Sequence, residues 1–188
     1  MALIDIGAAA TDRNINLAPA YTGIDLENPA NDTGTLTSIE IWLALDGSGV
    51  KVFTASRDGD KFTPRDVVTL ADITAGSKVT RTTDVSSNPI ALEVESGDYI
   101  GVYTGGGRVE RGASGGSGFY YKAGDQTAAG EQTYTLASGE VLSLYATGVT
   151  PVTTSIKTLN GTAIGLLVRW NGKAIDDYKT IMGISNVD

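Results

Sequence analysis

The sequence predicts an all-β protein, an antiparallel β-sandwich of jelly-roll-like form followed by a short C-terminal β-repeat extension. Glycine is abundant, with 24 among 188 residues, well above its usual share in soluble domains. Threonine, valine and isoleucine lie between the glycines, which is the composition of strands joined by tight turns. No segment before residue 150 shows the apolar period of an amphipathic helix.

The predicted strands are marked by alternating apolar and polar residues. In 39–45, isoleucine and leucine occupy every second position, with Glu40 and Trp42 between them, so one face should be buried. The Asp-Gly-Ser-Gly sequence at 46–49 then leads into 50–54, which predicts a hairpin. Further strands are predicted at 67–70, 79–83, 90–94, 99–103, 108–110, 119–121, 133–136 and 141–146. We expect roughly ten to twelve short strands in all.

Three parts of the chain differ in character. Residues 1–148 carry the strand patterns and are predicted to form the sandwich. Residues 149–155 are polar and β-branched with Pro151 among them, which predicts a linker. Residues 156–188 repeat with a shift of 11 residues, which marks a separate assembly segment.

The repeat is clear in two copies and weaker in a third. The copies are 156–164, 167–175 and 178–186. Asn-Gly in the first two favours a strand, a tight turn and a second strand. The third has Met182 in place of asparagine, and residues 174–182 fit a helix as well as a strand, because Ile175, Tyr178 and Ile181 would share a helical face.

The repeats are the predicted assembly site. A strand-turn-strand unit this small cannot bury its own apolar face, so it must stack on like units or on a neighbouring protein. Trp170 would contact another subunit or pack on the sandwich of its own chain. The candidate contact and turn residues are Ile156, Leu159, Asn160, Gly161, Leu167, Trp170, Asn171 and Gly172.

Charge and composition exclude several function classes. The net charge of −8 would repel a phosphate backbone, so no nucleic-acid partner is expected. No apolar run is long enough to cross a bilayer, so no membrane insertion is expected. Cysteine and histidine are absent, which excludes disulfides, thiolate metal sites and imidazole catalysis. We therefore predict a protein that is not an enzyme and that holds no metal and no cofactor.

The acidic residues fit turns and solvated strand faces better than a reactive site. Asp58-Gly59-Asp60 offers two carboxylates to calcium, but the spacing is that of a hairpin turn and not of a calcium loop. Glycoside hydrolysis needs two carboxylates at a set separation across a cleft. The glutamates are instead spread over different predicted strands and turns: Glu40, Glu93, Glu95, Glu131 and Glu140.

One segment is a candidate ligand surface. A loop of glycine, serine and alanine at 112–118 precedes Phe119, Tyr120 and Tyr121. Aromatic rings stack on sugar rings, and loops at the end of a sandwich often carry binding sites. The alternative is that alternate aromatics enter the core and that the loop is simply long.

Five short motifs lie along residues 4 to 148: Ile4-Asp5-Ile6-Gly7, Asn28-Pro29-Ala30-Asn31, Ser38-Ile39-Glu40-Ile41-Trp42, Gly97-Asp98-Tyr99-Ile100-Gly101-Val102-Tyr103 and Leu142-Ser143-Leu144-Tyr145. In these motifs, residues 4 to 148 resemble a domain of tailed-bacteriophage virion structural proteins, and the repeats resemble the C-terminal ends of many phage particle proteins. The resemblance implies a non-enzymatic virion protein, either a head decoration or a tail or fibre component. Its implied partners are other virion proteins and further copies of itself, with a trimer as the first expectation by analogy.

A carbohydrate-binding or receptor-binding adhesin module is the alternative function. It predicts a sugar site near the glycine-rich loop and residues 119–121, with a host-surface glycan as the partner. A phage adhesin would combine both functions. A hydrolase is a third hypothesis, and it would require clustered carboxylates that the sequence does not reveal.

Overall fold

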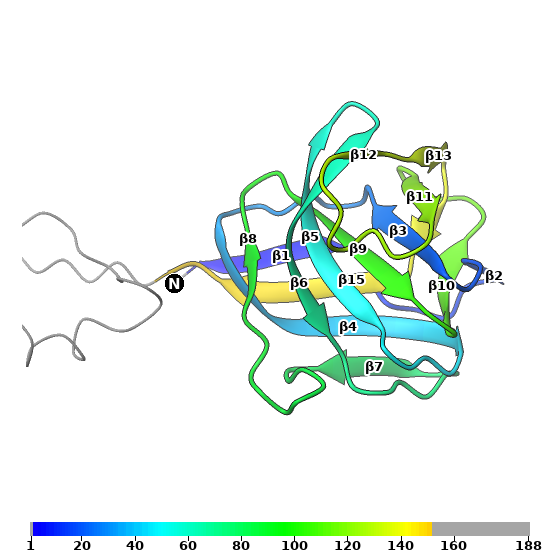
Figure 1. Ribbon diagram of the computed structural model, residues 1–188, viewed down its shortest axis with the longest axis horizontal. Coiled ribbons are helices and arrows are strands. Elements are labelled where there is room, and N and C mark those ends of the chain that lie inside the picture. Colours follow the sequence, from blue (N-terminus) through cyan, green and yellow to red (C-terminus); the bar gives the residue numbers. More distant parts are fainter. Residues whose placement is uncertain (1, 152–188) are drawn as a thin grey trace, which may run out of the picture. The chain divides into compact units, whose positions relative to one another are not determined.

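A computed structural model describes residues 2–151 (Figure 1). Ala2–Thr150 form one compact unit of β-strands without a helix. The strands are β1 (Leu3–Gly7), β2 (Ile15–Asn16), β3 (Tyr21–Asp25), β4 (Gly34–Leu45), β5 (Lys51–Asp58), β6 (Lys61–Thr69), β7 (Lys78–Arg81), β8 (Leu92–Val94), β9 (Tyr99–Thr104), β10 (Arg108–Gly112), β11 (Phe119–Ala123), β12 (Gln132–Thr133), β13 (Thr135–Ala137), β14 (Val141–Leu142) and β15 (Leu144–Val149). The all-β prediction is confirmed.

The strands form two antiparallel sheets that pack as a sandwich. Sheet 1 has eight strands in the order β1-β15-β4-β10-β14, with β2 on β10 and with β7 and β8 on β4. Sheet 2 has seven strands in the order β12-β6-β5-β9-β3-β11-β13. In Figure 1 the strands β5, β6 and β9 pass obliquely across β4 and β15, as expected for two twisted layers.

The main core lies between the sheets and is built from alternate residues of each strand. On β4, Ile39, Ile41 and Leu43 are fully buried, as predicted, whereas Leu45 at the strand end is half exposed. Val52 faces them from β5. Burying one such side chain stabilises the fold by roughly 1.5–3 kcal/mol, so this layer supplies much of the stability.

A smaller aromatic cluster covers the outer face of sheet 2. Phe53 belongs to it, whereas its neighbour Val52 belongs to the main core, which places the two clusters on opposite faces of the sheet. Phe53 lies directly over Gly101 of β9, where a Cβ atom would overlap its ring. The other buried members are Ile24, Ala55, Phe62, Tyr120 and Tyr134.

The predicted hairpin between 39–45 and 50–54 is wrong. β4 belongs to sheet 1 and β5 to sheet 2, so residues 46–50 carry the chain from one layer to the other. The backbone of Gly47 pairs with Ile73 at 2.9 Å in both directions, and fully buried Val50 enters the core. Strand alternation and a glycine turn cannot tell a hairpin from a crossover, because both begin and end in the same way.

The open edge of β1 is covered by the segment 28–31. The Asp5 N–H donates to Oδ1 of Asn31 at 3.1 Å, and Nδ2 of Asn31 donates to the Leu3 carbonyl at 3.3 Å. The Gly7 N–H donates to the Asn28 carbonyl at 3.0 Å. An amide side chain thus takes the place of a further strand and blocks edge-to-edge association.

Candidate functional site

An aromatic pocket of about 390 Å³ lies between the two sheets at one end of the sandwich. Sheet 2 contributes residues of β3, β11 and β13, and sheet 1 contributes a residue of β10. This volume lies near the lower end of the range for small-molecule sites. Its lining residues are Leu17, Ala18, Tyr21, Arg111, Phe119, Tyr121, Leu136, Ala137 and Glu140.

Three aromatic rings form the apolar part of the pocket. Phe119 is buried, while Tyr21 and Tyr121 are only partly buried. The Tyr121 ring lies 6.0 Å from the Phe119 ring and 6.1 Å from the Tyr21 ring, measured between centroids, with tilted planes. Adjacent strands β3 and β11 thus place two phenol rings next to a buried ring.

One ion pair supplies the charge in the pocket. Arg111 of β10 pairs with Glu140, and its guanidinium lies over the Phe119 ring at 5.7 Å. Its Nε donates to the Asn16 carbonyl at 3.0 Å, which fixes the side chain. Burial lowers the pKa of Arg111, and the nearby Tyr121 phenol opposes that shift. Arginine stays protonated at physiological pH, so the pair is an ionic one.

The glycine-rich loop is fastened to the structure beside this pair. The Gly118 N–H donates to the Glu140 carbonyl at 2.9 Å, and the Gly116 N–H donates to the Gly139 carbonyl at 3.0 Å. A Glu27 carboxylate oxygen accepts the Ser117 N–H. Gly118 has φ +109°, a conformation that side chains rarely adopt. The glycines therefore allow a close approach that positions Glu140.

The predicted ligand surface is only partly brought together. Phe119 and Tyr121 line the pocket. Tyr120 points to the other face of sheet 2, where it packs in the outer aromatic cluster and its hydroxyl accepts a hydrogen bond from Arg57 at 3.2 Å. Strand alternation requires this split. Sequence reasoning missed Tyr21 and Arg111 as lining residues, because nothing local links them to 119–121.

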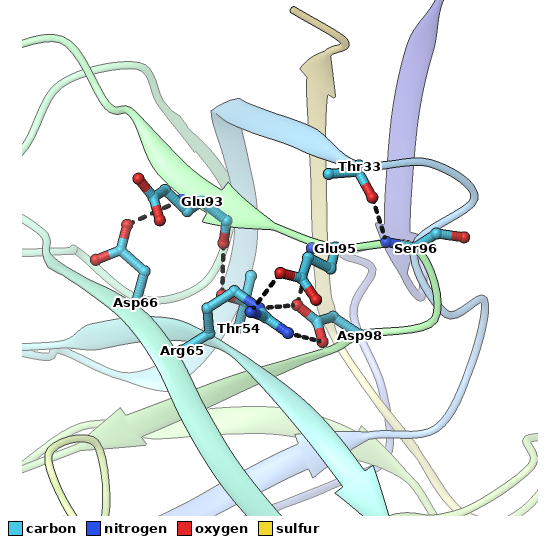
Figure 2. Close-up of polar contacts among 8 residues, drawn as sticks. All are labelled: Thr33, Thr54, Arg65, Asp66, Glu93, Glu95, Ser96 and Asp98. Atoms are coloured by element: carbon cyan, nitrogen blue, oxygen red, sulfur yellow. Dashed lines mark hydrogen bonds and ion pairs between the residues drawn. The ribbon is translucent and has the colours of Figure 1, made fainter. Parts of the chain in front are cut away.

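A polar clamp holds the turn between β8 and β9 against sheet 2 (Figure 2). Asp98, only 3% exposed, accepts hydrogen bonds from Nε of Arg65 at 2.6 Å and from the Glu95 N–H at 2.9 Å. Arg65 also pairs with Glu95 at 2.8 Å. The hydrogen bond to Asp98 raises the pKa of Arg65. Both carboxylates bind one guanidinium, so they are not arranged as an acid and a base across a cleft.

The clamp extends along β8 itself. The Thr54 hydroxyl donates to the Glu93 carbonyl at 2.6 Å, and the Glu93 N–H donates to Asp66 at 2.8 Å. The Ser96 N–H donates to the Thr33 hydroxyl at 3.0 Å. Because β8 pairs with β4 of sheet 1, these side chains of β5 and β6 join the two sheets through it (Figure 2).

Arg65 reaches the clamp because of a β-bulge. Thr54 pairs with Asp66 and Ala55 pairs with Pro64, which leaves Arg65 as the extra residue on β6. A bulge re-aims the side chain at its extra position. Pro64 lacks an N–H and is tolerated next to such an irregularity.

Four of the five scattered glutamates pair with a lysine or an arginine, and Glu93 takes part in the clamp through its backbone. The partners are Lys78 for Glu40, Arg65 for Glu95, Lys61 for Glu131 and Arg111 for Glu140. Asp58 and Asp60 flank the β5–β6 turn, where Gly59 has φ +64°. Within residues 2–151, no group of three or more acidic side chains is placed to hold a metal ion. The same residues include no helix able to cross a membrane.

One buried carboxyl group lacks a full set of partners. Asp25 of β3 is fully buried, and its Oδ1 accepts the Glu27 N–H at 3.2 Å. Its Oδ2 has no hydrogen-bond partner among the described residues. Burial raises the pKa of Asp25 to about 7, because an ionised carboxylate is poorly solvated inside a protein.

The predicted assembly residues, Ile156 to Gly172, lie outside the described residues, as does the choice between helix and strand for 174–182. Comparison with known protein families, curated proteins and solved structures finds no match to this chain.

Proposed function

We propose that this chain is a non-enzymatic structural protein of a bacteriophage particle. It presents a surface-exposed β-sandwich, as a head decoration or as a tail or fibre component. Its C-terminal repeats dock it to the particle or to like subunits.

The observation that carries this proposal is the compact unit Ala2–Thr150, which ends shortly before the repeats begin at residue 156. The first and last residues of this unit are joined by two hydrogen bonds. The Thr150 N–H donates to the Ala2 carbonyl, and the Ala2 N–H donates to the Thr150 hydroxyl. The resemblance of 4–148 and of the repeats to phage particle proteins supports the same assignment. The carboxylates of Asp66, Glu95 and Asp98 hold β8 and the turn after it in place, which favours a structural role for them over catalysis.

Solution mass tests the docking role. We expect the full chain to form an oligomer, with a trimer first, and a chain truncated after residue 150 to be monomeric and folded. Particles that lack the protein should take up the full chain and not the truncated one. If both forms are monomers and neither binds a particle, the repeats do not act as an assembly segment and the proposal fails.

A second candidate function is carbohydrate or receptor binding, alone or within a phage adhesin. The pocket favours it, because partly exposed tyrosine rings beside an arginine–glutamate pair are groups that recognise sugars. A glycan array probed with the truncated chain tests this candidate. Binding that is lost when the pocket residues are altered supports it, and a blank array removes it.

A further inference from the structure

We propose that the pocket between β10 and β11 takes a single neutral pyranose ring, stacked on one face of the Tyr21–Tyr121 pair and held at its hydroxyls by Arg111 and Glu140. This inference rests on the second candidate function, and it names the ligand class.

The size and shape of the pocket indicate one sugar ring on one side of the aromatic pair. A ring between Tyr21 and Tyr121 would need two carbon contacts of about 3.5–4.0 Å each. The phenol centroids lie only 6.1 Å apart, which is too close for that. The ligand therefore rests against one ring face, with Leu17 and Leu136 as further apolar contacts. A volume of about 390 Å³ leaves room for a monosaccharide or a chain end.

The polar groups are those that a sugar hydroxyl needs. The Arg111 guanidinium has five N–H donors, of which Nε is used by Asn16 and Nη1 faces Glu140. Nη2 donates to no acceptor among residues 2–151, so it can donate to a ligand. Glu140 also lines the pocket, and its second carboxylate oxygen can accept from a sugar hydroxyl. Adjacent hydroxyls of a pyranose provide both a donor and an acceptor.

Charge selects a neutral ring. Arg111 and Glu140 cancel one another, and they are the only charged side chains among the lining residues. An ionised sugar acid would bring a second carboxylate beside Glu140, and the two like charges would compete for one guanidinium. A neutral ring keeps the ion pair intact and adds no charge.

Ligand titration of the full chain by saturation-transfer NMR tests the inference. The probes are the methyl pyranosides of glucose, galactose, mannose and N-acetylglucosamine, with methyl glucuronide as the charged comparison. We expect at least one neutral probe to bind with a Kd of about 1–10 mM, as suits so small a ligand, and the glucuronide to bind more weakly. No saturable binding by any neutral probe overturns the proposal.

Two variants and a control locate the site. Tyr121→Leu removes a stacking ring and should weaken binding about fivefold to tenfold, as loss of about 1 kcal/mol implies. Glu140→Gln keeps the shape of the pocket but breaks the ion pair, so it tests the site even if the first variant unfolds. Tyr103→Leu alters a half-buried tyrosine outside the pocket lining and should leave binding within about twofold. Binding that neither pocket variant changes overturns the assignment.

The outcome separates this inference from the functions on which it builds. A glycan array that responds equally to the wild-type chain and to Tyr121→Leu keeps the adhesin function and removes this pocket. Oligomerisation and particle uptake do not depend on the pocket, so they report only on docking.

Discussion

Asp25 makes the stability of this protein depend on pH in a way that one substitution should abolish. Its pKa is raised from 3.8 to about 7 by burial. The folded protein therefore keeps a proton on Asp25 that the unfolded chain releases once the pH exceeds 3.8. The contribution to stability is complete below the unfolded pKa and is lost as the pH rises through the folded pKa.

The size of the effect follows from the shift. A change of one pKa unit is worth about 1.4 kcal/mol, so a shift from 3.8 to about 7 corresponds to about 4 kcal/mol. Asp25→Asn keeps the acceptor for the Glu27 N–H but cannot ionise. We expect the variant to match the wild type near pH 4 and to be more stable by up to about 4 kcal/mol above pH 8.

Urea unfolding of both proteins at intervals from about pH 4 to pH 9 measures the difference. Asp60→Asn, in the exposed β5–β6 turn, is the matched control and should give a curve parallel to that of the wild type. The reasoning is refuted if the stability gap between Asp25→Asn and the wild type stays constant over this range.

Three further substitutions test other parts of the fold. Asp98→Ala leaves Arg65 with one carboxylate in place of two and should cost about 2–4 kcal/mol in urea unfolding; an unchanged midpoint would mean that the clamp does not stabilise the fold. Gly101→Ala places a methyl group in the Phe53 ring and should lower Tm, with a cost of about 1–3 kcal/mol, whereas an unaltered Tm would show that Phe53 moves aside freely. Asn31→Ala uncovers the edge of β1 and should increase aggregation as measured by light scattering, and scattering equal to that of the wild type would contradict the role given to this edge.

The local residue pattern was sufficient to predict the fold class and many of the strands, because alternating apolar and polar residues directly indicate a strand with one buried face. It worked well at 39–43, where each predicted core residue is fully buried. It failed for β2, since a two-residue strand carries no measurable period, and it predicted β14 and β15 as one strand at 141–146. It also missed β1 and β3, although Ile4 and Ile6 are buried on one face of β1.

The sequence predicted some residues of the candidate site and missed others. An aromatic run after a glycine-rich loop pointed to Phe119 and Tyr121, and alternation already implied that Tyr120 would face the other way. Tyr21 lies about a hundred positions earlier in the chain and reaches the pocket only because β3 pairs with β11. Arg111 arrives from the opposite sheet, so its role depends on how the layers pack.

The sequence was enough to establish an all-β chain with alternating strand faces, a clear two-copy repeat and the absence of histidine and cysteine. These features are visible in the sequence because composition and strand periodicity depend only on residues that are close together in the chain. Tertiary structure alone decided that the chain crosses between sheets at 46–50, that the bulge turns Arg65 onto Asp98, and that Asn31 closes the edge of β1. Each of these features joins segments that are distant in the chain. Their partners are selected by packing and hydrogen-bond satisfaction over the whole domain, which a local pattern does not encode.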